Sequence, residues 1–116
     1  MTKIFFEGPH GKVCGVHENV GSDELVILIH GFSSNKETSA KINAKTLNQI
    51  GLDTIRIDLD NQGESELDFK TGVSIPNYVD QVETVMKNLE YPKTSLLGTS
   101  FGGIVALATA MKHPEI

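Results

Sequence analysis

The sequence of 116 residues has no tryptophan, a single cysteine and an aromatic content of only 6%. One cysteine excludes a disulfide within the chain, and we expect Cys14 to be a small buried residue in a strand rather than a reactive thiol. No apolar run approaches the roughly 20 residues that a membrane-spanning helix requires. Residues 1–7 also lack the apolar segment of a signal peptide. These absences predict a cytoplasmic protein without a membrane partner.

Basic residues are scarce as well, because 10 Lys and Arg stand against 15 Asp and Glu and give a formal net charge of −5. No basic stripe is present to meet phosphates, so we predict that the protein does not bind nucleic acid. The four histidines and the one cysteine show no metal-ligand spacing. We therefore expect neither a metal nor another cofactor in a single domain that spans residues 1–116.

The hydrophobic pattern predicts strands that alternate with helices. Two short strands at 2–8 and 12–17 flank a turn and are expected to form an antiparallel hairpin. The apolar run 25–29 predicts a strand buried on both faces, and segments 53–58 and 94–97 predict two more. This alternation implies an α/β fold with a mostly parallel sheet and helices on both of its faces.

Three segments predict these helices, and a long polar loop is expected over residues 59–73. The first helix is expected to be capped within residues 33–35 and to end at Gly51. The second begins at about Ser74 with Pro76 in its first turn, and the third ends before Pro114. The expected buried stripe of the first helix consists of Ala40, Ala44, Leu47 and Ile50.

Residues 98–103 read Gly-Thr-Ser-Phe-Gly-Gly between two apolar segments, and they contain a G-x-S-x-G motif. Between a strand and a helix, the glycines of this motif allow a sharp turn that exposes the serine, so Ser100 is the candidate nucleophile. Gly98 and Gly102 would support the turn, and the N–H of Phe101 would stabilise a developing oxyanion. The alternative is a glycine-rich turn before a buried helix. A phosphate-binding loop would need a lysine and glycine spacing that are absent.

A second oxyanion donor is expected after the apolar run 25–29, where the sequence reads His30-Gly31-Phe32. The N–H of Phe32 is the candidate donor, with His30 and Gly31 in support. His30 is also the only local candidate for a general base. Of the remaining histidines, we expect His113 to face away at the end of the third helix. His10 and His17 are expected at the surface.

Three landmarks occur in the order found in the N-terminal half of an α/β-hydrolase-fold serine hydrolase, which the chain resembles. They are His-Gly-Phe at 30–32, Asp-x-x-x-x-Gly-x-Ser at 58–65 and the elbow at 98–102. Within this family the chain resembles small bacterial esterases of the cinnamoyl or feruloyl type. The resemblance implies hydrolysis of a small acyl ester through an acyl-serine. The same elbow also serves lipases, thioesterases, peptidases and acyltransferases.

The loop at 58–65 departs from the family pattern at two positions. Asn61 stands where members usually carry glycine, and Gln62 stands where they often carry histidine. Asparagine tolerates left-handed backbone, so we expect Asn61 to keep the same turn, and Gly63 is retained. We interpret this loop as a structural brace near the active site and not as a source of catalytic groups. Asp58 and Asp60 at the end of the strand are candidates to orient a base, but such carboxylates more often cap or brace a loop.

In this family the acid and the base follow the serine, and the resemblance implies that the chain lacks both, together with the C-terminal strands and the cap. Three hypotheses follow. The chain is a truncated esterase with little activity alone, a hydrolase completed by another chain, or a non-catalytic remnant that acts as an assembly or binding module. The strand near 93–98 would expose a bare edge. This edge predicts self-association or pairing with a chain that carries the C-terminal half.

Overall fold

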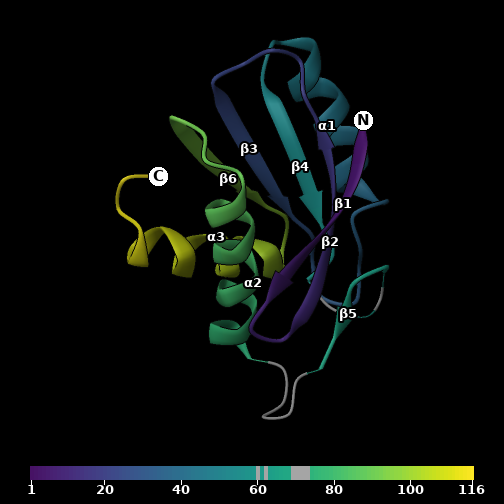
Figure 1. Cartoon of the computed structure of the whole chain (residues 1–116), viewed down its shortest axis with the longest axis vertical. Coiled ribbons are helices and arrows are strands. Elements are labelled where there is room, and N and C mark those ends of the chain that lie inside the picture. The colour runs from purple at the N-terminus through teal and green to yellow at the C-terminus, as the bar shows by residue number, and fades with distance from the viewer. Residues whose placement is uncertain (60, 62, 69–73) are drawn as a thin grey trace.

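The computed structural model describes residues 1–59, 61, 63–68 and 74–116, and within these residues it has three layers (Figure 1). A mixed sheet lies between α1 on one face and the pair α2 and α3 on the other. The strands are β1 (Thr2–Gly8), β2 (Gly11–Glu18), β3 (Glu24–Ile29), β4 (Asp53–Ile57), β5 (Glu66–Leu67) and β6 (Lys93–Gly98). The helices are α1 (Ser39–Gln49), α2 (Ile75–Asn88) and α3 (Phe101–Lys112). The predicted α/β class is confirmed.

The strand order is β1-β2-β4-β3-β6, with β5 beside β2. β1 and β2 form the predicted antiparallel hairpin, in which Thr2 lies opposite His17 and Gly8 opposite Gly11. β3 pairs in parallel with β4 and β6, whereas β2 pairs antiparallel with β4 and β5. The prediction of a mostly parallel sheet therefore holds for three neighbouring strands only. The N-terminal hairpin joins the parallel strands through β4 and makes the sheet mixed.

β4 is buried along its whole length, including its polar residues. α1 covers one face of this strand, and Asn48 on α1 donates from Nδ2 to the hydroxyl of Thr54 over 3.2 Å. On the same strand the guanidinium of Arg56 lies 2.9 Å from a carboxylate oxygen of Glu18 on β2. The alternation of polar and apolar residues along β4 therefore does not indicate a solvent-exposed face, because the polar side chains of this strand are paired inside the protein.

The start of α1 differs from the prediction, and its end agrees with it. Its N-cap residue is Thr38, without a side-chain cap. Asn35 instead accepts a hydrogen bond from the N–H of Glu37 over 2.8 Å, so it caps a local turn and not the helix. Gly51 follows the helix at φ 92°, as a residue at C′ should. The predicted buried stripe is correct at Ala40 and Ala44 and wrong at Ile50, which is exposed.

α2 begins where the sequence predicted. The hydroxyl of Ser74 accepts from the N–H of Asn77 over 3.3 Å, and Pro76 lies in the first turn. A buried apolar stripe faces the sheet and belongs to the larger hydrophobic core. Its fully covered members are Tyr78, Val79, Val82 and Val85.

The segment predicted as a loop over 59–73 contains β5, which pairs with β2 at Gly11 and Lys12. The side chain of Asn61 pairs with the backbone of Leu67 by two hydrogen bonds of 2.8 and 2.9 Å. The turn expected at Asn61 depends on residues 60 and 62 and so stays a prediction. Asp60 and Gln62, to which the sequence analysis assigned roles, lie outside the described residues.

α3 packs on the sheet through Val105, which is fully buried. Its opposite face presents an apolar stripe at 51–77% exposure, formed by Ile104, Leu107 and Met111. Beside α3, β6 lies at the edge of the sheet and pairs with β3 alone among the described strands (Figure 1).

Cys14 is buried in β2, as predicted, and burial raises the pKa of its thiol. None of the described helices has the length and apolar character needed to cross a bilayer.

Candidate active site

Ser100 lies in the tight turn between β6 and α3, with its backbone at φ 56° and ψ −121°. Positive φ is uncommon for a non-glycine residue and is concentrated at functional sites. The turn is held by the N–H of Thr99, which donates to the carbonyl of Ile29 over 3.0 Å, and by that of Gly103, which donates to the carbonyl of Ser100 over 2.8 Å. The serine is exposed at the carboxyl ends of the parallel strands.

The glycines around Ser100 are needed because backbone segments approach each other closely. A Cβ on Gly98 would overlap the backbone of Gly102. A Cβ on Gly102 would overlap the carbonyl groups of Ile29 and His30 at the end of β3. Only glycine lets the start of α3 approach β3 in this way.

The His30-Gly31-Phe32 segment lies directly against this turn. A Cβ on Gly31 would be 3.3 Å from the carbonyl oxygen of Thr99 and 3.5 Å from the Cβ of Ser100. The rings of Phe32 and Phe101 meet edge to face with centroids 5.9 Å apart, and Phe101 makes a similar contact with Tyr78 at 5.6 Å. The structure therefore brings together the two segments whose amides the sequence analysis selected.

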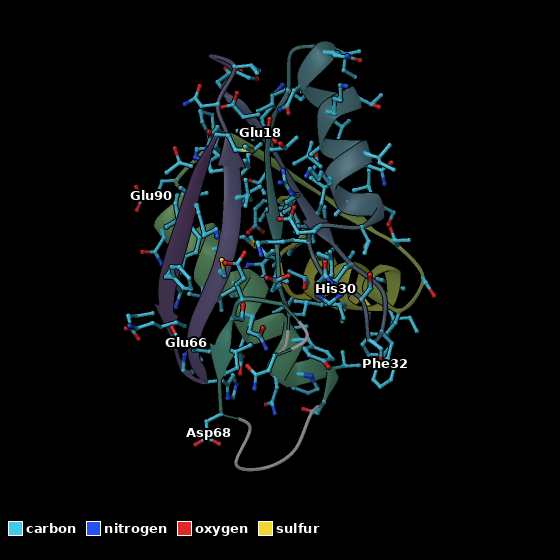
Figure 2. The ribbon with its side chains drawn as sticks, turned by 90° about the vertical axis from the view of Figure 1, so that its right-hand side faces the viewer. Glu18, His30, Phe32, Glu66, Asp68 and Glu90 are labelled. Carbon is cyan, nitrogen blue, oxygen red and sulfur yellow. The ribbon has the colours of Figure 1, made fainter. Side chains whose placement is uncertain are left out.

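Phe32 and His30 lie in different environments although they are two residues apart. Figure 2 shows Phe32 at the rim of the molecule, where it is 69% exposed, and His30 among the packed side chains. The N–H of Leu59 donates to Nε2 of His30 over 2.9 Å, so Nε2 carries no hydrogen. Nδ1 therefore carries it and donates to the carbonyl of Gly31 over 2.7 Å. Both ring nitrogens of His30 are therefore hydrogen-bonded to backbone groups, one in this loop and one in the segment after β4.

The amino-acid sequence of the chain matches a known family. The sequence profile described as alpha/beta hydrolase fold matches residues 24–116. The chain belongs to the α/β hydrolase fold family. Human serine hydrolase BPHL is 35% identical to it over 96 residues, which cover 80% of this chain and 33% of BPHL. A probable alcohol acetyltransferase of Cyberlindnera fabianii is 31% identical over 108 residues, which cover 93% of this chain and 29% of that protein.

Solved structures of this fold superpose closely on the chain. Est1E from Butyrivibrio proteoclasticus with ferulic acid bound gives a TM-score of 0.82 at 24% identity, over 97% of this chain and 49% of Est1E. The epoxide hydrolase VrEH1 from Vigna radiata gives 0.86 at 20% identity, over 98% and 36% of the two chains. The chain thus spans about a third of BPHL and just under half of Est1E.

In this hydrolase fold the loop that follows β4 encloses a buried ion pair. The carboxylate of Asp58 lies 2.6 Å from Nζ of Lys36, and both side chains are within 1% of full burial. Asp58 also accepts from the N–H of Lys36 and from the N–H of Glu64, each over 2.8 Å. A Cβ on Gly63 would overlap the Asp58 carboxylate, so glycine is required there. The predicted brace at Asp58 is present in the structure.

The burial of Lys36 was not predicted from the sequence, because a lysine in a polar segment gives no indication of burial. Burial alone would lower the pKa of Lys36, but its hydrogen bonds to Asp58 and Glu64 outweigh that effect and raise the pKa above its ordinary value. Hydrogen bonds from Lys3 and Lys36 lower the pKa of Glu64 to about 2. The lysine is therefore a buried cation with three carboxylate partners, Asp58 at 2.6 Å, Glu64 at 2.9 Å and Glu37 at 3.9 Å.

The other three histidines contact acidic or phenolic groups elsewhere in the fold. Nε2 of His10 lies 3.0 Å from Asp80, and Nε2 of His17 lies 2.8 Å from the hydroxyl of Tyr91. Both are partly buried, so each lies at the surface with one side of its ring packed against the protein. His113 contacts Glu83 at 2.6 Å. In the described part of the chain no hydrogen bond joins Ser100 to a histidine, and no group of acidic, histidine or cysteine side chains could hold a metal ion.

Proposed function

We propose that this chain is the nucleophile-bearing part of a serine hydrolase that cleaves carboxylic esters through an acyl-serine at Ser100. The observation that supports this most directly is the turn between β6 and α3, where Ser100 is exposed and its backbone has a positive φ. A serine hydrolase among the relatives and a ferulic acid complex among the similar structures support the same class of chemistry.

In this mechanism the hydroxyl oxygen of Ser100 attacks the carbonyl carbon of the ester, and its proton passes to a base. The N–H groups of Phe32 and Phe101 stabilise the oxyanion of the tetrahedral intermediate. Phe101 is suited to this role because the first N–H groups of a helix have no partner within it. Collapse of the intermediate expels the alcohol and leaves the acyl-serine, which water then hydrolyses.

We propose that the base and the acid lie outside the matched region, either in further sequence of the same polypeptide or in another chain. The relatives extend well beyond the part that this chain matches. His30 is unsuitable because both of its nitrogens are engaged. The 116 residues alone should therefore have little activity.

Intact-mass spectrometry after incubation with a fluorophosphonate tests the role of Ser100. We expect one phosphonyl adduct and turnover of p-nitrophenyl acetate when the base is supplied, and the loss of both in Ser100→Ala. Turnover that survives in Ser100→Ala would overturn the proposal. A substrate screen in which thioesters react far faster than oxygen esters would overturn the ester assignment alone.

The second candidate function is assembly through the outer edge of β6 and the apolar stripe Ile104, Leu107 and Met111. The observation that favours it is that the outer edge of β6, which no described strand pairs with, lies beside a helix with exposed apolar side chains. Size-exclusion chromatography with light scattering should then give a species larger than a monomer. A stable monomer would argue against it. The cytoplasmic location predicted from the sequence stays a prediction.

A further inference from the structure

The turn that carries Phe32 has a strained backbone. The N–H of Ser34 donates to the carbonyl of Gly31 over 3.1 Å and closes a four-residue turn over 31–34. Ser33 occupies its third position at φ 59°, where glycine or asparagine is favoured. Such a conformation persists only when the surrounding structure holds it.

Two side chains flank this turn, and both bind the same short segment after β4. Before the turn, Nε2 of His30 accepts from the N–H of Leu59 over 2.9 Å. After the turn, the N–H of Lys36 donates to Oδ1 of Asp58 over 2.8 Å, and its Nζ donates to Oδ2 over 2.6 Å. The strained turn is thus fixed at both ends to two consecutive residues.

The anchor at Lys36 is a charged one, and its environment makes it rigid. Lys36 and Asp58 are both buried, and Nζ has a second carboxylate partner in Glu64 at 2.9 Å. A buried charge that leaves its partner loses this attraction without regaining water, so neither side chain can move away easily. The hydroxyl of Ser65 donates to the carbonyl of Asp58 over 2.7 Å and holds that residue from the other side.

We infer that Lys36 is a positioning residue, whose buried contact with Asp58 fixes the turn 31–34 and so holds the N–H of Phe32 where the oxyanion forms. This inference rests on the proposed function of Ser100 and Phe32. Lys36 does not touch the substrate, since it lies beneath the loop among acidic side chains. Lys36 acts on the transition state indirectly, through the backbone of residues 32–35.

The test is Lys36→Met in the protein with its base supplied, by further sequence or by a second chain, with p-nitrophenyl acetate as the substrate and a fluorophosphonate titration to count functional sites. Methionine keeps much of the side-chain volume but removes the charge and the Nζ hydrogen bonds. We expect kcat per titrated site to fall about 10- to 100-fold while KM stays within about twofold, because an oxyanion contact acts mainly in the transition state. Lys41→Met is the matched control, since Lys41 is exposed and, among the described residues, its ammonium forms an ion pair with Glu37 at 3.5 Å. It should leave kcat unchanged.

A purely structural role would lower the melting temperature and the number of titrated sites without changing kcat per site, and this result would overturn the inference. Should Lys36→Met fail to fold, Asp58→Asn changes the same contact from the other side with little change in volume, and the same criteria apply to it. Ser100→Ala separates the two proposals. If it abolishes turnover while kcat in the Lys36 or Asp58 variant stays at the wild-type value, only the positioning role is overturned.

Discussion

The hydroxyl of Tyr91 donates to Oδ2 of Asp53 over 2.5 Å, and its oxygen accepts from Nε2 of His17 at 2.8 Å. Oδ1 of Asp53 accepts from the N–H groups of Val20 and Ser22 at 2.7 and 3.1 Å. This hydrogen-bonded chain joins β2, the start of β4 and the turn after α2. Asp53 is the first residue of β4, so the chain lies at the end of the parallel strands opposite Ser100. We expect it to affect stability rather than catalysis.

Replacement of Tyr91 by phenylalanine should destabilise the protein by about 1–3 kcal/mol at pH 7, because the buried carboxylate of Asp53 loses a donor. Burial first, and then the hydrogen bond to Asp53, raises the pKa of Tyr91. Its contribution is therefore complete below about pH 10, the ordinary tyrosine value, and is lost as the pH rises further. In urea denaturation, the free energy of unfolding should decline less between pH 8 and 11 for Tyr91→Phe than for the wild type. Equal declines would contradict the assignment.

On the acid side, His17 should govern part of the loss of stability. Burial lowers the pKa of His17 below its ordinary value of 6.5, although the charge of Asp53 opposes this effect. The unfolded chain thus binds a proton at a higher pH than the folded chain, and stability falls as the pH drops below about 6.5. Thermal unfolding followed from pH 7.5 to 5 should show a flatter profile in His17→Gln, which cannot titrate. A profile parallel to the wild type would show that another group is responsible.

Two adjacent glycines at the elbow should respond in opposite directions to the same substitution. Gly102→Ala places a Cβ against the carbonyl groups of Ile29 and His30 and should be strongly destabilising. Gly103→Ala meets nothing closer than 3.6 Å and should stabilise α3 by up to about 1 kcal/mol through helix propensity. Circular dichroism melts of both variants check this. A similar loss in both would mean that the close approach of α3 to β3 is not the cause.

Truncation of a side chain should cost far more stability on the buried face of α3 than on its exposed face. Val105→Ala removes two methyl groups from a fully buried position and should cost roughly 2 kcal/mol. Leu107→Ala alters a side chain that is 63% exposed and should stay within about 0.5 kcal/mol. Denaturant unfolding at low protein concentration measures both. A large loss in Leu107→Ala would show that the stripe on α3 is covered in solution.

Local patterns determined most of the elements. The apolar run of β3, the stripe of α2 and the cap at Ser74 each depend on residues close in sequence, so periodicity and capping rules were sufficient. The turn at Ser100 was equally predictable, because Gly98 and Gly102 occur at fixed spacings from the serine. The predictions failed where a distant segment decides the outcome. Residues 33–35 cap no helix, because Lys36 is drawn inward by Asp58.

The sequence by itself therefore determined the α/β pattern, the family landmarks and the candidate nucleophile, because these depend on short-range spacing. Only the tertiary structure decided that His30 accepts a hydrogen bond from Leu59, and that Lys36 is buried beside Asp58. It also decided that the side chain of Asn61 pairs with the backbone of Leu67. The physical reason is common to all three. Burial and hydrogen bonding of a polar side chain depend on partners brought together by folding, and no local pattern specifies those partners.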